Sequence, residues 1–152
     1  MGIVMSGIHV SRKRQNGFTF IEILVSIVIL AVGLLSIAGL VTTVIKGNVS
    51  SKKTTTAIAL AQTKIEELKN KPFTDPELED TNASNNFNLS STISIDHSEE
   101  GIDENGEAGG YYNRIWNVAN NIPSSGIKTV EVIITWQDNG AHSISFTTAI
   151  AE

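Results

Sequence analysis

The longest predominantly apolar stretch of this chain lies at residues 18–41. A helix of about 24 residues rises 1.5 Å per residue and crosses the roughly 30 Å hydrocarbon core of a bilayer. Glu22 is the one charged residue in the run. A carboxylate is costly within lipid, so Glu22 requires an explanation.

The helical pattern continues past the apolar run to about Asn70, before Pro72 ends it. Apolar and small residues recur here at spacings of three and four and form one stripe, made of Thr54, Ile58, Ala61, Ile65 and Leu68. The charged residues Lys64, Glu66, Glu67 and Lys69 are expected mostly off this stripe. The pattern therefore predicts one helix over about 18–70, whose second half packs against another element.

Beyond residue 90 the apolar pattern changes to a period of two, which predicts strands at 91–96, 111–118, 129–136 and 143–150. One face of the last three strands is apolar, with Tyr112, Trp116 and Val118, then Val130, Val132, Ile134 and Trp136, then Ile144, Phe146 and Ile150. The segment QDNG at 137–140 predicts a hairpin turn, because Asn139 and Gly140 accept positive φ.

These elements predict an α+β fold, in which one long N-terminal helix packs on a small antiparallel sheet of three to four strands. The expected organisation is a leader (1–17), a membrane or assembly half of the helix (18–41) and a head (42–152). Within the head we expect the rest of the helix at 42–70, a loop at 71–91 and the sheet at 92–150.

Charge and composition narrow the function classes. The 152 residues carry a net charge of −5, and loss of residues 1–17 would remove three cations and leave −8. An acidic body argues against general nucleic-acid binding, which needs a basic surface. The chain has no cysteine, which excludes disulfides and thiolate metal sites.

A basic cluster of Arg12, Lys13 and Arg14 precedes the apolar run. The positive-inside rule places this end in the cytoplasm, although Lys46, Lys52 and Lys53 beyond the run weaken the asymmetry. A Sec signal peptide remains an alternative, with Ser36-Ile37-Ala38 as its cleavage site, but the run exceeds the usual 7–15 apolar residues. A plain membrane anchor is the stronger alternative.

Glu22 also has a purely local interpretation. Thr19 and Glu22 have the spacing of a capping box, which stabilises the start of a helix. This interpretation does not explain why the helix starts at the apolar boundary.

The segment Gly17-Phe18-Thr19-Phe20-Ile21-Glu22, after a short charged leader and before an apolar helix, resembles the class III signal of type IV pilins and pseudopilins. The resemblance implies that a prepilin peptidase cuts between Gly17 and Phe18 and methylates the new Phe18 amine. It also implies that Glu22 pairs with the Phe18 amine of a neighbouring subunit in a filament.

Two further segments, 29–40 and 113–148, resemble PilV-type minor pilins, also called type IV pilus modification proteins. Their motifs are Arg-x-Trp-x-Val, Val-x-Val-x-x-x-Trp and the Gly-containing hairpin. Together with the N-terminal signal, the resemblance covers about half of the chain. Major pilins often carry a C-terminal cysteine pair and a helix-bending proline, whereas this chain has no cysteine and has Gly39 at the proline position.

The resemblance implies a minor pilin that initiates or modifies pilus assembly, with no catalysis and no cofactor. Its expected partners are prepilin peptidase, other major and minor pilins, the inner-membrane assembly platform and, before assembly, membrane lipid. It would span the inner membrane once, with the C-terminus in the periplasm, and later enter the pilus. The alternatives are a pseudopilin of a type II secretion system and an uncleaved bitopic protein with a small periplasmic domain.

Other polar residues carry weaker signals. The acidic segment 96–107 lacks EF-hand spacing and is expected to be a solvated hairpin loop, a calcium-binding loop being the alternative. His97 and His142 have no metal-binding spacing, and Trp116 and Trp136 are expected in the core. Arg114 shares a face with Trp116 and is expected to reach the sheet edge with its stem buried, the alternative being a contact with a neighbouring subunit.

Overall fold

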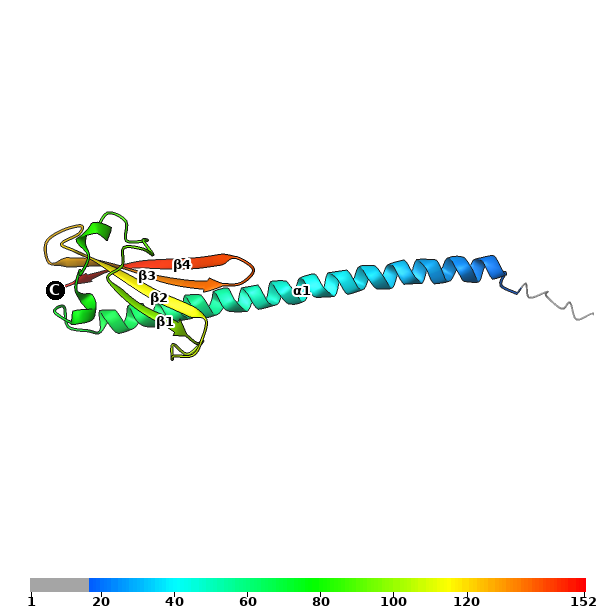
Figure 1. The fold of residues 1–152 in the computed structure, drawn as a ribbon, viewed down its shortest axis with the longest axis horizontal. Helices are drawn as coiled ribbons and strands as arrows, with labels where there is room; N and C mark the ends of the chain where they lie inside the picture. Colours follow the sequence, from blue (N-terminus) through cyan, green and yellow to red (C-terminus); the bar gives the residue numbers. More distant parts are fainter. Residues whose placement is uncertain (1–16) are drawn as a thin grey trace, which may run out of the picture. The chain divides into compact units, whose positions relative to one another are not determined.

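The computed structural model describes residues 17–152 and confirms an α+β fold (Figure 1). Helix α1 spans Phe20–Lys69, and two short 3-10 turns follow it, η1 at Pro76–Leu78 and η2 at Ala83–Asn85. The strands are β1 (His97–Ile102), β2 (Tyr112–Asn120), β3 (Ile127–Gln137) and β4 (Ala141–Ala151). They form one antiparallel sheet in the order β1-β2-β3-β4.

The chain divides into two compact units at a boundary within α1, between Val44 and Ile45. The described part of the first unit is the apolar half of α1, which is long and apolar enough to cross a membrane. Its large side chains are exposed from Phe18 onward. A helix that is apolar all round needs lipid or other chains around it.

Hydroxyl groups in this apolar half are satisfied within the helix itself. Ser26 donates to the Glu22 carbonyl at 2.7 Å, and Ser36 donates to the Val32 carbonyl at 2.8 Å. Thr42 bonds the Gly39 carbonyl in the same manner. These hydroxyls therefore add little cost when the helix lies in an apolar environment.

The second unit, Ile45–Glu152, is the head. The second half of α1 packs on the inner face of the sheet, and the residues that it buries there are Ala57, Leu60, Ala61, Lys64 and Leu68. The inner face of β2 and β3 is buried as the alternating pattern predicts, through Tyr112, Trp116, Val118, Val130, Val132, Ile134 and Trp136. Leu78 of η1 closes the core.

The predicted hairpin turn and inner faces are confirmed. Asn139 and Gly140 have φ values of 52° and 150°, the positive values expected in the turn. Ile150 is buried, and Ile144 and Phe146 are partly buried on the same core. The period of two located the inner face because successive side chains of a strand point to opposite faces of the sheet, although the middle of β2 and β3 is buried on both faces.

The predicted helix stripe was in part wrong. Ala61 and Leu68 are buried, but Thr54, Ile58 and Ile65 lie only at the margin of the buried face. Lys64, expected off the stripe, is 1% exposed. The helix is rotated so that Ala57 and Ala61 approach the sheet closely, and carboxylates from other elements compensate the ammonium that this rotation buries.

The predicted strand at 91–96 was also wrong, because the first strand is β1 at His97–Ile102. Side chains of β2 hold the backbone of the preceding loop: Asn117 donates to the carbonyls of Leu89 and Ser91 and accepts from the Asp96 N–H. These bonds replace strand pairing in this segment. The segment 96–107, expected to be a solvated loop, therefore contains the strand β1, and its turn lies after Ile102.

That turn closes around Asp103. Its carboxylate accepts the backbone N–H groups of Glu107 at 2.9 Å and of Asn105 at 2.8 Å. These bonds, that from Glu107 first, lower the pKa of Asp103 below its ordinary value. Gly106 has a φ of 86°, which suits glycine in a tight turn. The carboxylate thus has a turn-forming role.

Candidate functional site

The first candidate site lies at the start of α1. Gly17 and Phe18 precede the helix, and Thr19 is the residue before its first turn. The Thr19 side-chain oxygen accepts the Glu22 N–H at 3.4 Å, and the Thr19 carbonyl accepts the same N–H at 3.1 Å. Thr19 therefore caps the helix in the manner of one half of a capping box.

The Glu22 carboxylate takes no part in this cap, which uses the Glu22 backbone N–H. Within residues 17–152, no hydrogen bond or ion pair engages it. It lies among the side chains of Phe18, Ile23, Ser26 and Ile27 on the helix surface. An anion among apolar side chains is stabilised when it pairs with a cation, and another molecule can supply that cation.

Phe18 is 80% exposed and lies four residues before Glu22. At 1.5 Å per residue this separation corresponds to about 6 Å along a helix axis. A charge at the Phe18 amine and the Glu22 carboxylate would thus lie about one helical turn apart. The leader residues Arg12, Lys13 and Arg14 lie outside the described residues, and cleavage after Gly17 stays a prediction.

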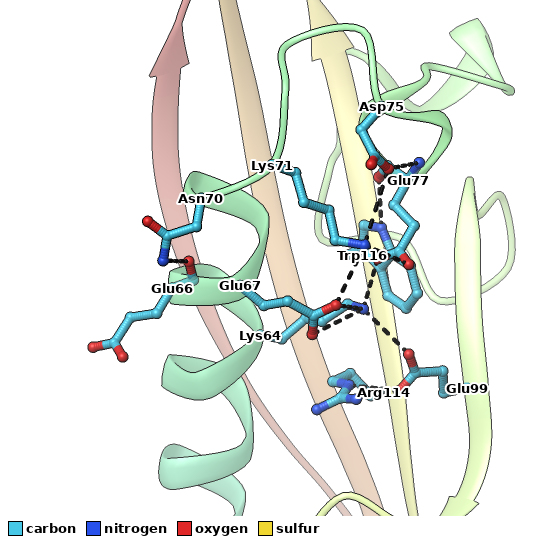
Figure 2. A network of polar contacts seen from close by, with 10 residues as sticks. All are labelled: Lys64, Glu66, Glu67, Asn70, Lys71, Asp75, Glu77, Glu99, Arg114 and Trp116. Carbon is cyan, nitrogen blue, oxygen red and sulfur yellow. Dashed lines mark hydrogen bonds and ion pairs between the residues drawn. The ribbon is translucent and has the colours of Figure 1, made fainter.

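The second candidate is a cluster of charges in the head (Figure 2). The Lys64 ammonium lies 2.8 Å from Glu77, 3.2 Å from Glu99 and 3.4 Å from Glu67. It also lies 4.2 Å from the centre of the Trp116 ring. One buried cation of α1 thus connects the helix with η1 and with the sheet.

Two more cations complete this ion cluster. Lys71 lies 2.8 Å from Glu77, and Arg114 donates through Nε to Glu99 at 2.8 Å. The cluster of Lys64, Lys71, Arg114, Glu67, Glu77 and Glu99 is therefore balanced in formal charge. Arg114 is buried and reaches the edge strand β1, which agrees with the expected buried stem.

Two of the three glutamate partners of Lys64 are distant in the chain, which explains why Lys64 could not be placed from the local pattern. Glu77 is 13 residues away in the chain and Glu99 is 35 residues away. A second stripe with spacings of three and four was present in the sequence and could have located the buried face of the helix. Its residues are Ala57, Leu60, Ala61, Lys64 and Leu68.

Charge pairing sets the ionisation of the cluster outside the membrane segment. Burial alone would raise the pKa of Glu77, but hydrogen bonds from Lys64 and Lys71 outweigh it and lower this pKa. The hydrogen bond that the Lys71 ammonium donates to Glu77 raises the pKa of Lys71. Every charged group of the cluster faces an opposite charge. The geometry therefore indicates a structural role, in which the cluster holds α1 against η1 and the sheet.

A pH dependence follows from the lowered pKa of Glu77. The stability that this group contributes is present above its unfolded pKa, near 4.5, and is lost as the pH falls through the lower folded value. We expect the free energy of unfolding to fall as the pH drops below about 4.5, and to fall less steeply in Glu77→Gln. Denaturant titrations read by tryptophan fluorescence measure this, since Trp116 and Trp136 both lie in the head.

Glu100→Gln is the matched control for this titration. Glu100 is exposed on β1 and takes part in no salt bridge among the described residues. Its substitution should leave the pH profile unchanged. A Glu77→Gln profile as steep as that of the unmodified chain would contradict the assigned role of Glu77.

The two histidines among residues 17–152 pack on tryptophans. The His97 ring stacks on Trp116 with ring centres 5.2 Å apart, and the His142 ring stacks on Trp136 at 5.4 Å. In the described part of the chain, no group of three or more histidine or carboxylate side chains is placed to hold a metal ion.

Comparison with known proteins agrees with the site at the start of α1. Residues 12–38 match the family model of the prokaryotic N-terminal methylation motif. No curated protein and no solved structure matches the chain. The motif and the apolar helix support a membrane-anchored, prepilin-like protein of a type IV pilus or a related system.

Proposed function

We propose that this chain is a minor pilin of a type IV pilus, which is processed by prepilin peptidase and helps to initiate or modify pilus assembly. The observation that carries the proposal is the methylation motif at residues 12–38, placed across the start of an apolar helix. Motif and helix occur in the order that a cleaved and retained signal requires. The resemblance of 29–40 and 113–148 to PilV-type minor pilins supports the finer assignment.

In this proposal the apolar half of α1 has two successive environments. Before assembly, lipid surrounds it. During assembly, the equivalent helices of neighbouring subunits replace lipid, and the exposed apolar surface is buried in a helix bundle. Self-association of this kind requires no catalytic group.

Glu22 supplies the register of that bundle. After cleavage, the methylated amine of Phe18 is a cation at the edge of an apolar helix, and Glu22 is an anion about one turn farther along. If a subunit enters with its helix shifted along the axis, its Phe18 amine meets the Glu22 carboxylate of a neighbour. Pairing then removes two uncompensated charges from an apolar interior.

Two departures from major pilins favour a minor subunit. The head holds its sheet without a disulfide, through the hydrophobic core and the ion cluster. The helix α1 contains no proline, because the first proline of the chain is Pro72. On the family resemblance, both features fit a minor pilin better than a shaft-forming major pilin.

Mass spectrometry of the N-terminal peptide from the membrane fraction tests this proposal. We expect a chain that begins at Phe18 with a methylated amine, in cells with an active prepilin peptidase. The same cells without the peptidase are the control, and should contain the uncleaved chain, in which Gly17 still precedes Phe18. An intact N-terminus in both strains would mean a plain membrane anchor and would overturn the proposal.

Fractionation then separates a pilus from a secretion system. Sheared pili should contain the processed chain if it is a minor pilin. Retention of all processed chain in the cell envelope, together with loss of protein secretion in a deletion strain, would instead favour a pseudopilin.

A further inference from the structure

The outer edge of β4 is an extended backbone surface with no partner. β4 pairs with β3 on one side over its whole length, from Ile127↔Ala151 to Gln137↔Ala141. The sheet order leaves its other side at the edge of the sheet. Among residues 17–152, no hydrogen bond from a loop or side chain reaches the backbone of this outer side.

The hydrogen bonds at both ends of β4 establish which residues face outward. The Asp138 N–H donates to the Gly140 carbonyl at 2.9 Å, and the Glu152 N–H donates to the Gly126 carbonyl at 3.0 Å. In an antiparallel pair, bonded residues alternate with non-bonded ones. The bonds at both ends therefore show the same alternation. Even-numbered residues of β4 bond to β3, and odd-numbered residues point their N–H and C=O groups outward.

The outward-bonding residues are all small and exposed. They are Ala141, Ser143, Ser145, Thr147, Ala149 and Ala151. Their side chains lie on the outer face of the sheet, so none of them blocks the approach of another backbone. The even-numbered Ile144 and Phe146 lie on the opposite face and are only partly buried.

The other edge of the sheet is protected in several ways. β1 has six residues and carries Glu99 and Glu100, and its register with β2 is irregular between Glu99 and Ile102. The Gly101 carbonyl is already occupied by the N–H groups of Gly109 and Gly110. Charges, short length and bulges are the usual protection of edge strands. β4 has eleven residues, a regular register, no proline and no carboxylate, lysine or arginine.

We propose that the free edge of β4 is a docking site for an extended strand of a second, different protein. The partner strand would bond to the outward N–H and C=O groups of the odd-numbered residues and extend the sheet by one strand. It would be uncharged, to match an edge without ionised side chains, and apolar at every second position. Those apolar side chains would cover Ile144 and Phe146 and continue the core.

A second copy of this chain fits the edge poorly. Two β4 edges paired in antiparallel fashion are related by a two-fold axis through the sheet, which also reverses the part of α1 within the head. The chain would then enter the two heads from opposite ends, whereas copies anchored in one membrane enter from the same side. A two-fold axis along the strands keeps both helices parallel, but it places the two apolar rows on opposite faces of the joined sheet. The β1 edge of a second copy carries Glu99 and Glu100 and is too short.

The exclusion of a second copy rests on the proposed membrane anchoring, whereas the free edge is a property of the head. A free peptide has no anchor, so the peptide AHSISFTTAIA, the sequence of β4, can approach from either direction. It has the stated chemistry, because it is uncharged apart from its histidine and has Ile and Phe at alternate positions. It therefore serves as the probe.

The experiment measures binding of this peptide, labelled with a fluorophore, to the full chain in detergent by fluorescence anisotropy. We expect saturable binding that Ser145→Pro weakens by about tenfold, because proline removes one outward N–H and disrupts its neighbours. Ser145→Ala is the matched control, since it keeps the N–H, and it should bind within about twofold of the unmodified chain. Proline at this position spares the bonds to β3, which the even-numbered residues make.

A second variant, Ser145→Lys with Thr147→Lys, tests the same edge without a backbone change. It should lose binding as well, because edge lysines oppose strand addition. Unchanged tryptophan fluorescence establishes that each head is folded. Absence of binding to the unmodified chain, or equal binding to the proline and lysine variants, would overturn the docking site. Neither result alters the N-terminal processing that tests the proposed function.

Discussion

Glu22→Ala should leave the chain inserted in the membrane and cleaved after Gly17, but largely absent from filaments. In the proposed bundle the alanine leaves the neighbouring Phe18 amine as an uncompensated cation in an apolar interior. Breaking a buried ion pair in this way costs about 3–5 kcal/mol, equivalent to a roughly hundredfold or larger loss of incorporation. Immunoblots of sheared pili and of membranes from the same cells measure the ratio.

Two controls separate a charge pair from a helix cap. Ser26→Ala changes a residue one turn farther along, whose hydroxyl bonds only the Glu22 carbonyl, and should incorporate normally. Thr19→Ala removes the cap and keeps the carboxylate, at a cost of about 1 kcal/mol. Normal incorporation of Glu22→Ala, or an equal loss in Thr19→Ala, would show that Glu22 acts only on the start of the helix.

Lys64→Met should destabilise the head strongly, by about 2–4 kcal/mol. Methionine retains most of the buried stem but removes the ammonium that lies between Glu77 and Glu99. These carboxylates then face each other with less compensation, while Lys71 and Arg114 still pair with one each. Because the glutamates are partly exposed, we place the effect below that of a fully buried pair.

Lys69→Met is the matched control, on the same helix. Lys69 is exposed and takes part in no salt bridge of the described head, so the substitution should change stability by less than about 0.5 kcal/mol. Guanidinium titrations of full chains in detergent, read by tryptophan fluorescence, measure both variants. A Lys64→Met head as stable as the Lys69→Met head would mean that the ion cluster contributes no net stability.

These two variants probe different halves of α1. Glu22 lies in the half that has no protein cover within residues 17–152, and its proposed partner comes from another subunit. Lys64 lies in the half that packs on the sheet, and its partners are in the same chain. The first variant should therefore fail in assembly with a folded head, and the second should fail in folding.

The features that the sequence determined by itself are local ones. The apolar run of 18–41, the single long helix, the Asn139-Gly140 turn and the inner faces of β2, β3 and β4 each follow from residues close together in the chain. Helical and strand periodicity operate over a few residues, so no distant partner is needed to recognise them. The methylation motif at the start of the helix is local for the same reason.

The tertiary structure decided whatever depends on distant partners. Lys64 is buried because the carboxylate of Glu99, 35 residues away in the chain, compensates its positive charge. The strand β1 begins at His97, because Asn117 bonds the backbone around 89–96. Glu99 of β1 then pairs with Lys64 and Arg114. The free edge of β4 likewise depends on strand order, which no pattern within β4 specifies. A local period shows that a segment has a buried face, but the elements that assemble around it determine which charges that face can hold and which edge stays open.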